Sequence, residues 1–409
     1  MSRRVLAISI PWAGLSMLGD GLSALLLPYL LIVTVSGDLQ ETTLGIVTLA
    51  GIGLAMVVQP VAGALSDALG KRRPLLLAGL VIALVGLALM GAGAGAGIAV
   101  VLIGYLAALA GANTAQAGLQ ALVPDEVPAS WRGRAAGLKG AMDVGGAFVA
   151  FALLAALLAS GALWPSVVII GLTLVLTLAP ALLGRSKPAA GQRGMMLNPS
   201  ILWRGLAEQP AFARLLVARF CFLLGIYAVG RFLALFMSQR LGLDADTTAA
   251  QAGAVLALLA LGTALGSIPA GWAADRFGRR PLMVAGAVVA AAGIGLLPLA
   301  TSTMQIALLG SLLAIGTASF GAGSWALATD LVPADDAARQ MGLANYATAG
   351  AAAMAGLFGP VVDAGERLAP GVGYPALMIG AALAAAMGGL VALRVPETTT
   401  LLTSLEERA

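Results

Sequence analysis

Long, uninterrupted apolar runs constrain this chain more than any other feature. Many of them exceed the roughly 18 residues that indicate a membrane-spanning helix. They are continuous, whereas the strands of a membrane barrel alternate over about ten residues. Only 10% of the residues are charged, against about 25% in a typical soluble domain. The sequence therefore predicts an all-α integral membrane protein.

Twelve apolar segments can be counted, and most of the gaps between them are short. They cover residues 5–35, 44–65, 74–92, 97–123, 135–159, 163–184, 212–239, 248–271, 281–300, 304–332, 341–362 and 373–395. The longest gap is polar and basic and contains three prolines, which is typical of a linker. We therefore predict a six-helix bundle at 1–184, a linker at 185–211 and a second six-helix bundle with a short tail at 212–409.

The Lys and Arg residues are distributed very unevenly. Of the 23, 19 fall at the N-terminus, in the even-numbered loops or in the C-terminal tail, and two, Arg240 and Arg367, lie in the other loops. The remaining two, Arg219 and Arg231, lie inside the seventh segment. Because basic loops stay in the cytoplasm, we predict cytoplasmic termini in a plasma or inner membrane. Dispersal of the basic residues among membrane segments does not favour binding to nucleic acid.

Histidine is absent and Cys221 is the only cysteine. The chain therefore lacks the usual proton carrier near neutral pH and cannot form an internal disulfide. It also lacks the Gly-x-x-x-x-Gly-Lys-Ser/Thr loop that binds nucleotide phosphates. We predict no enzyme activity, no cofactor and no metal site, and any proton chemistry must use Asp or Glu.

Two landmarks recur along the chain. Asp67 and Asp275 are 208 positions apart, and the tripeptide at Leu122–Pro124 returns at Leu331–Pro333 with an offset of 209. Such offsets indicate an internal duplication of the kind found in transporter folds. A repeat of six helices keeps its orientation in the membrane, so the two halves are expected to be pseudo-symmetric about the membrane normal.

The pattern G-x-x-x-D-x-x-G-x-R-R lies between the second and third segments of the first predicted half, and the second half carries a version in which the two arginines follow the last glycine directly. The first copy comprises Gly63, Asp67, Gly70, Arg72 and Arg73, and the second comprises Gly271, Asp275, Arg276, Gly278, Arg279 and Arg280. With its twelve helices and central loop, the whole chain resembles the major facilitator superfamily. The resemblance implies a monomeric transporter. The first copy departs from the family in having Ala68 where an arginine is common.

The glycine and aspartate of each motif copy suggest a latch on the cytoplasmic side. Gly63 and Gly271 lie one turn before the aspartates, and small residues allow close helix approach. A carboxylate at Asp67 or Asp275 can then face the positive N-terminal end of a helix. The resemblance implies the starts of the fifth and eleventh segments as these helix ends. The alternative for Lys71, Arg72 and Arg279 is that they only anchor the cytoplasmic side.

Asp330, at the end of the tenth segment, is the predicted partner of Arg276 or Arg280 in the second copy. The first repeat has Ala121 at the equivalent position under the offset of 209.

Two charges lie well inside apolar segments, Asp20 in the first and Arg231 in the seventh. A charge at mid-bilayer costs about 2.5–3.5 kcal/mol on insertion scales, so it usually faces a cavity or a partner. The offset of 208 brings Arg231 within one helical turn of Asp20, at a similar depth. We predict that Asp20 binds a proton or a monovalent cation. Arg231 is predicted either to bind an anionic group or to keep Asp20 ionised.

Other polar residues leave two interpretations open. Asn113, Gln116 and Gln120 form one helical stripe, which either lines a cavity or bonds to neighbouring helices. Asp143 follows Lys139 by one turn, which suits a local ion pair as well as a role in transport. Arg219 lies nearer the cytoplasmic end, where a snorkelling side chain is the simpler interpretation.

These features together predict a secondary active transporter that moves a small organic solute by alternating access, coupled to a proton or another cation. Export of drugs or metabolites and uptake of an organic anion or sugar are both open. The alternative from another class is a non-transporting membrane receptor or assembly factor on the same fold.

Overall fold

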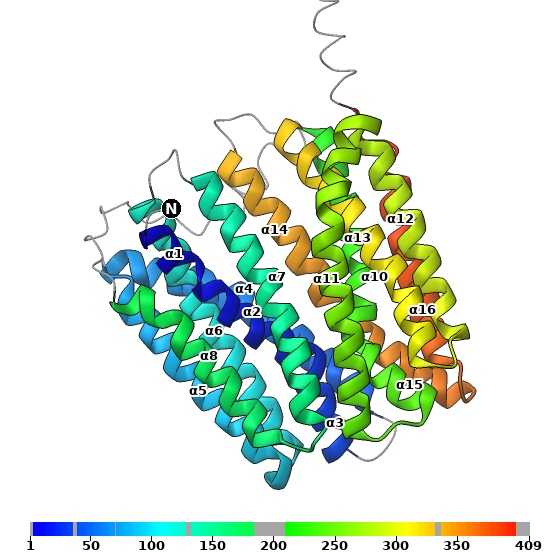
Figure 1. The fold of residues 1–409 in the computed structure, drawn as a ribbon, viewed down its shortest axis with the longest axis horizontal. Coiled ribbons are helices and arrows are strands. Elements are labelled where there is room, and N and C mark those ends of the chain that lie inside the picture. Colours follow the sequence, from blue (N-terminus) through cyan, green and yellow to red (C-terminus); the bar gives the residue numbers. More distant parts are fainter. Residues whose placement is uncertain are drawn as a thin grey trace, which may run out of the picture. The chain divides into compact units, whose positions relative to one another are not determined.

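A computed structural model describes residues 3–35, 39–69, 71–127, 132–183, 209–331 and 337–397. Every regular element within these ranges is helical (Figure 1). The predicted linker, except for its last three residues, lies outside the described ranges.

The elements up to the predicted linker are α1 (Arg3–Ser9), α2 (Pro11–Gly21), η1 (Leu22–Leu26), α3 (Leu27–Thr34), α4 (Gln40–Leu69), α5 (Arg73–Ala96), α6 (Ile98–Glu126), α7 (Arg132–Leu158) and α8 (Leu163–Leu183). Those after it are α10 (Pro210–Leu241), α11 (Ala245–Phe277), α12 (Arg279–Leu296), η3 (Leu297–Leu299), α13 (Thr303–Leu331), α14 (Ala337–Met354), η5 (Ala355–Leu357), α15 (Phe358–Leu368) and α16 (Gly373–Ala392).

Twelve helical spans are long and apolar enough to cross a membrane. The first span, Val5–Thr34, combines α1, α2, η1 and α3, and the eleventh, Leu343–Leu368, combines α14, η5 and α15. The predicted number of spans and the all-α class are therefore confirmed, and the chain is an integral multi-pass membrane protein.

The chain forms two compact units. The first contains Met1–Leu197 and Leu233–Ala257, and the second contains Asn198–Phe232 and Leu258–Ala409. The boundary passes through α10 and α11, so each of these helices contributes to both units. The predicted six-plus-six division at the central linker stays a prediction.

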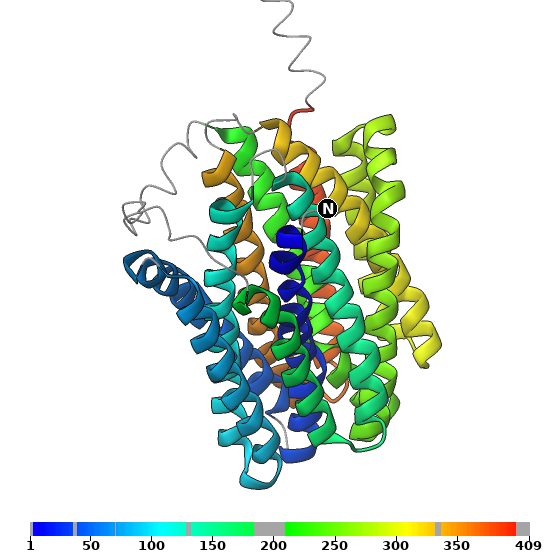
Figure 2. The ribbon, with the colours of Figure 1, turned by 60° about the vertical axis from the view of Figure 1, so that its left-hand side comes forward.

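In the first unit, α5 packs closely along α6 (Figure 2). The contact uses glycines at seven-residue spacing, Gly79, Gly86 and Gly93 on α5 and Gly104, Gly111 and Gly118 on α6. A Cβ added at Gly104 would lie 2.6 Å from the backbone nitrogen of Met90 and 2.7 Å from the carbonyl oxygen of Gly86. Only glycine lets the two backbones approach this closely.

In the second unit, α12 and α13 form the equivalent hairpin. Gly286 and Gly293 of α12 contact α13, and Gly316 and Gly323 of α13 contact α12. The glycines of α13 follow those of α6 by 205 positions, so Leu309 takes the place of Gly104. The landmark offset of 209 is therefore wrong for this helix by four residues, about one helical turn.

The first span contains a π-helical turn, Leu22–Leu26, directly after Asp20 and Gly21. Pro28 follows at the start of α3. Since proline has no backbone N–H, it cannot complete the regular α-helical ladder at this point. Such π-turns are frequent at functional sites, and this one adjoins the only acid within the span.

Gly278 separates α11 from α12 and has a φ of 93°. Side chains other than glycine rarely adopt this conformation, which explains why the motif needs a glycine here. Gly70, its counterpart in the first copy, lies outside the described residues.

Candidate functional site

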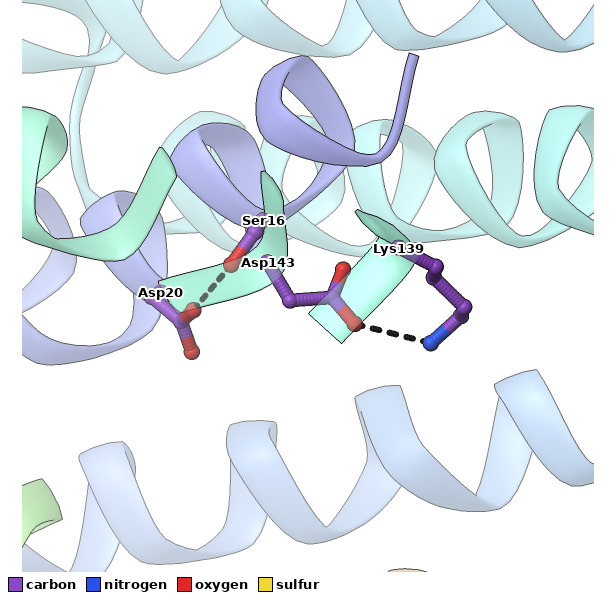
Figure 3. A network of polar contacts seen from close by, with 4 residues as sticks. All are labelled: Ser16, Asp20, Lys139 and Asp143. Atoms are coloured by element: carbon purple, nitrogen blue, oxygen red, sulfur yellow. Dashed lines mark hydrogen bonds and ion pairs between the residues drawn. The ribbon is translucent and has the colours of Figure 1, made fainter. Parts of the chain in front are cut away.

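Asp20 lies on α2 with its side chain exposed. Its carboxylate accepts a hydrogen bond of 2.7 Å from the hydroxyl of Ser16, one turn earlier (Figure 3). An added Cβ at neighbouring Gly19 would meet no described atom within 4 Å. The acid is therefore on an open face of the helix, and no described cation pairs with it.

Asp143 lies on α7 and is the second acid of this region. Lys139 donates to its carboxylate over 2.7 Å, one turn away on the same helix. The Lys139 ammonium also lies 4.0 Å from the centre of the Trp12 ring, which gives it a cation–π contact. The local ion pair considered from the sequence is thus present.

Close packing brings the two acids together. Ala13 and Gly21 of α2 face α7, where an added Cβ at Gly146 would collide with the Ala13 backbone. The carboxyl groups of Asp20 and Asp143 consequently interact electrostatically. Figure 3 shows that Asp143 is turned toward Lys139, while Asp20 is turned toward Ser16.

Among the described residues, one cation pairs with the two carboxylates of the acidic pair, Asp20 and Asp143. Lys139 offsets the charge of Asp143, which leaves Asp20 with a neutral hydroxyl donor and a nearby like charge. Binding a proton or a small cation at Asp20 removes that repulsion. The proximity of Asp143 was not predicted, because the two acids are 123 positions apart in the sequence and only helix packing brings them together.

Arg231 lies on α10 and is partly buried. It belongs to the second compact unit, whereas Asp20 belongs to the first. Their pairing stays a prediction.

The polar stripe of α6 divides into two kinds of residue. Asn113 accepts a hydrogen bond of 2.6 Å from the Gln59 amide of α4 and donates to the Leu109 carbonyl. It therefore joins two helices, as one of the two interpretations expected. Gln116 is partly buried and Gln120 is exposed, and a binding role for either stays a prediction.

Arg219 does not snorkel. It is only 5% exposed, and its Nη1 donates to the hydroxyl of Ser324 on α13 over 2.6 Å. Its guanidinium carbon lies 4.6 Å from the centre of the Trp325 ring. The simpler interpretation from the sequence is therefore wrong, since position along a helix does not show which face a neighbouring helix covers.

The second motif copy makes ion pairs within its own unit. Arg279 pairs with Asp330 and donates to the Ala326 carbonyl, which ties the start of α12 to the end of α13. Arg280 pairs with Glu397, and Arg276 lies over the Trp272 ring. The sequence predicted Arg276 or Arg280 as the partner of Asp330. The structure pairs Asp330 with Arg279 instead, because the helix register turns Arg279 toward it.

In the first copy, Arg72 is buried and donates to the Ser66 hydroxyl over 3.0 Å. By the glycine register of the two hairpins, Asp125 takes the position of Asp330, which corrects the expected Ala121. The Asp125 side chain lies outside the described residues. Arg73 is partly buried, and its Nε and Nη2 donate to no described residue.

The latch predicted from the motif joins the two halves of the chain and stays a prediction. Asp275 is exposed and forms no ion pair or hydrogen bond with a described residue, and the side chain of Asp67 lies outside the described set. Added Cβ atoms at Gly63 and Gly271 would meet no described atom within 4 Å. The close approach expected at these two glycines would join the two halves of the chain, and it stays a prediction.

Four polar residues that the sequence did not single out hold Leu233–Ala257 within the first unit. Tyr29 donates to Asp246 over 3.0 Å, and Gln239 donates to the buried carboxylate of Glu41 over 2.6 Å. All four lie near helix ends, where polar residues are common, so composition gave no signal for these contacts.

Comparison with known proteins places the chain by sequence and by fold. The family model described as Major Facilitator Superfamily matches residues 12–250 and 215–408. No curated protein matches the sequence significantly.

Solved transporter structures align over nearly the whole chain. A D-xylose-proton symporter has a TM-score of 0.75 at 17% identity, covering 97% of this chain and 98% of its own. The nucleoside transporter NupG has a TM-score of 0.74 at 13% identity, covering 96% and 99%. A bacterial homolog of the human lysosomal transporter Spinster, in an inward-facing and occupied conformation, has a TM-score of 0.73 at 14% identity, and the alignment covers 96% of each chain. At these identities the similarity establishes the fold.

Proposed function

The chain belongs to the major facilitator superfamily, and from that premise we propose that it is a secondary active transporter for a small organic solute. It works by alternating access, in which a central site opens to one side of the membrane at a time. The gradient of a proton or a monovalent cation drives the movement of the solute. The fold is shared with sugar and nucleoside transporters, one of them named as a proton symporter.

The acidic pair is the observation that carries the coupling proposal. Asp20 sits in a membrane span on an open helix face, with a hydroxyl donor and with Asp143 nearby. Ionised Asp20 repels Asp143, whereas protonated Asp20 does not, so proton binding changes the forces between α2 and α7. A cation bound at Asp20 has the same effect. The adjacent π-helical turn gives the first span a point at which it can change shape.

Arg231 is the proposed counterpart of the acidic pair. It either binds an anionic group of the solute or holds Asp20 ionised, as its depth in the seventh span suggests. The motif residues serve as a cytoplasmic latch through Asp67 and Asp275, with both termini in the cytoplasm and the protein in a plasma or inner membrane. The working form is a monomer.

The competing function is a membrane receptor that binds a solute without moving it. The experiment that separates the two begins with thermal stabilisation of purified protein by a panel of sugars, nucleosides and organic anions. Any stabilising solute is then tested for counterflow exchange in proteoliposomes. A transporter exchanges labelled solute across the vesicle membrane. Binding without exchange contradicts the proposed function and supports the receptor.

A further inference from the structure

The second unit holds a positive charge in its interior that the proposed coupling does not use. Arg219 of α10 is 5% exposed, and its hydrogen-bond partner Ser324 is fully buried. The Arg219 Nε atom is also buried and donates to no described residue.

Arg219 has no described carboxylate beside it. Among the described residues, its contacts are the Ser324 hydroxyl and the face of Trp325. A guanidinium keeps its charge in proteins, and buried charges are normally paired. The arrangement is therefore that of a cation whose anion comes from outside the described chain.

The surroundings of Arg219 suit a particular kind of anion. The guanidinium edge that contains Nε has donor capacity left, and such an edge binds carboxylates through two parallel hydrogen bonds. Trp325 covers the guanidinium with one face and is 43% exposed, so an aromatic surface borders the charge. One guanidinium balances one negative charge, which favours a monoanion over a phosphate dianion.

We infer that Arg219, Ser324 and Trp325 form a binding subsite for the carboxylate of an aromatic monoanion. This inference rests on the proposed function and narrows the solute to an organic acid. Arg219 binds the carboxylate, Ser324 fixes the guanidinium, and the indole of Trp325 packs against the apolar part of the solute.

Benzoate and benzamide are matched probes for this subsite, since they share a ring and differ in charge. We expect benzoate to raise the melting temperature of the purified full-length protein, and benzamide to leave it unchanged. Arg219→Gln is expected to weaken benzoate binding about tenfold or more, because a charge-assisted hydrogen bond is lost. Arg214→Gln is the matched control, as it removes an exposed arginine from the same helix.

Arg219→Lys and Trp325→Phe test the subsite if Arg219→Gln does not fold. Lysine keeps the charge but loses the planar fork, so benzoate should bind several-fold more weakly, and Trp325→Phe should have a smaller effect. No benzoate-dependent shift in the wild type, or unchanged benzoate affinity in both Arg219 variants, overturns the inference.

The two proposals fail in distinguishable ways. Counterflow of an uncharged solute that is insensitive to Arg219→Gln overturns the subsite and leaves the transporter intact. Benzoate binding that requires Arg219, with no exchange of benzoate in proteoliposomes, supports the subsite and contradicts transport.

Discussion

The hairpins α5–α6 and α12–α13 occupy equivalent places in the two repeats, yet they are stabilised differently. Both bring their backbones together through glycines at seven-residue spacing, but Leu309 stands in the second where Gly104 stands in the first. At their motif ends, Arg72 is buried against Ser66, whereas Arg279 forms an ion pair with Asp330. Backbone packing is thus the shared feature, and polar contacts have diverged.

This difference separates two properties of the motif arginines, namely their position on the helix and the identity of their partner. Arg72 lies directly before α5, and Arg279 is the first residue of α12. Each lies seven residues before a packing glycine, Gly79 or Gly286. Their position is set by the helix register. Their partner is set by whichever acceptor the neighbouring helix supplies, so the two ends should respond differently to mutation and to salt.

Gly104→Leu should have the largest effect, because it gives the first hairpin the residue found in the second. The new side chain would meet the backbone of Met90 and Gly86, and overpacking of this kind costs about 3 kcal/mol or more when backbone must move. We expect loss of a monodisperse protein or a large fall in melting temperature.

Gly95→Leu is the control for that substitution, since an added Cβ at Gly95 meets no described atom within 4 Å. Equal stability of wild type and Gly104→Leu would show that the first hairpin is no more tightly packed than the second.

Ser66→Ala and Asp330→Asn should separate the two motif ends. Ser66→Ala removes an acceptor from a buried charge, at a cost of about 1–2 kcal/mol that salt hardly changes. Asp330→Asn breaks a pair whose side chains are 28% and 23% exposed, so about 0.5–1 kcal/mol is lost at low salt and less at about 1 M salt. Thermal unfolding at both salt concentrations measures this.

Ser267→Ala is the matched control, because this exposed serine of α11 bonds only to its own helix. The comparison fails if the Ser66 variant is the more salt-sensitive of the two.

The sequence was sufficient for the class of fold and for the twelve spans, because both follow from apolar runs that exceed bilayer thickness. It also located Asp20, since a lone acid in an apolar run stands out. Tertiary contacts were not predictable in this way. Asp143 approaches Asp20 through glycines whose role is visible only once α2 packs on α7. The burial of Arg219 likewise depends on α13 covering one face of α10.

Helix register explains the errors in the motif. A tripeptide landmark aligned the repeats one turn out of register, so Ala121 was matched to Asp330 in place of Asp125. On a helix, a shift of four residues moves a side chain along the same face by slightly more than one turn, about 6 Å, which is enough to exchange one ion-pair partner for another.

Gradient-driven transport by Asp20→Asn tests the central claim most directly. Proteoliposomes are loaded with a solute that the wild type exchanges, and an imposed proton gradient or, separately, a sodium gradient is applied. We predict that one gradient drives accumulation by the wild type, and that Asp20→Asn loses accumulation but keeps counterflow exchange. Asp244→Asn is the control, because hydrogen bonds from the backbone and the hydroxyl of Thr247 lower the pKa of this exposed carboxyl, which therefore stays ionised at neutral pH. Accumulation by Asp20→Asn with the ion dependence of the wild type would contradict the account.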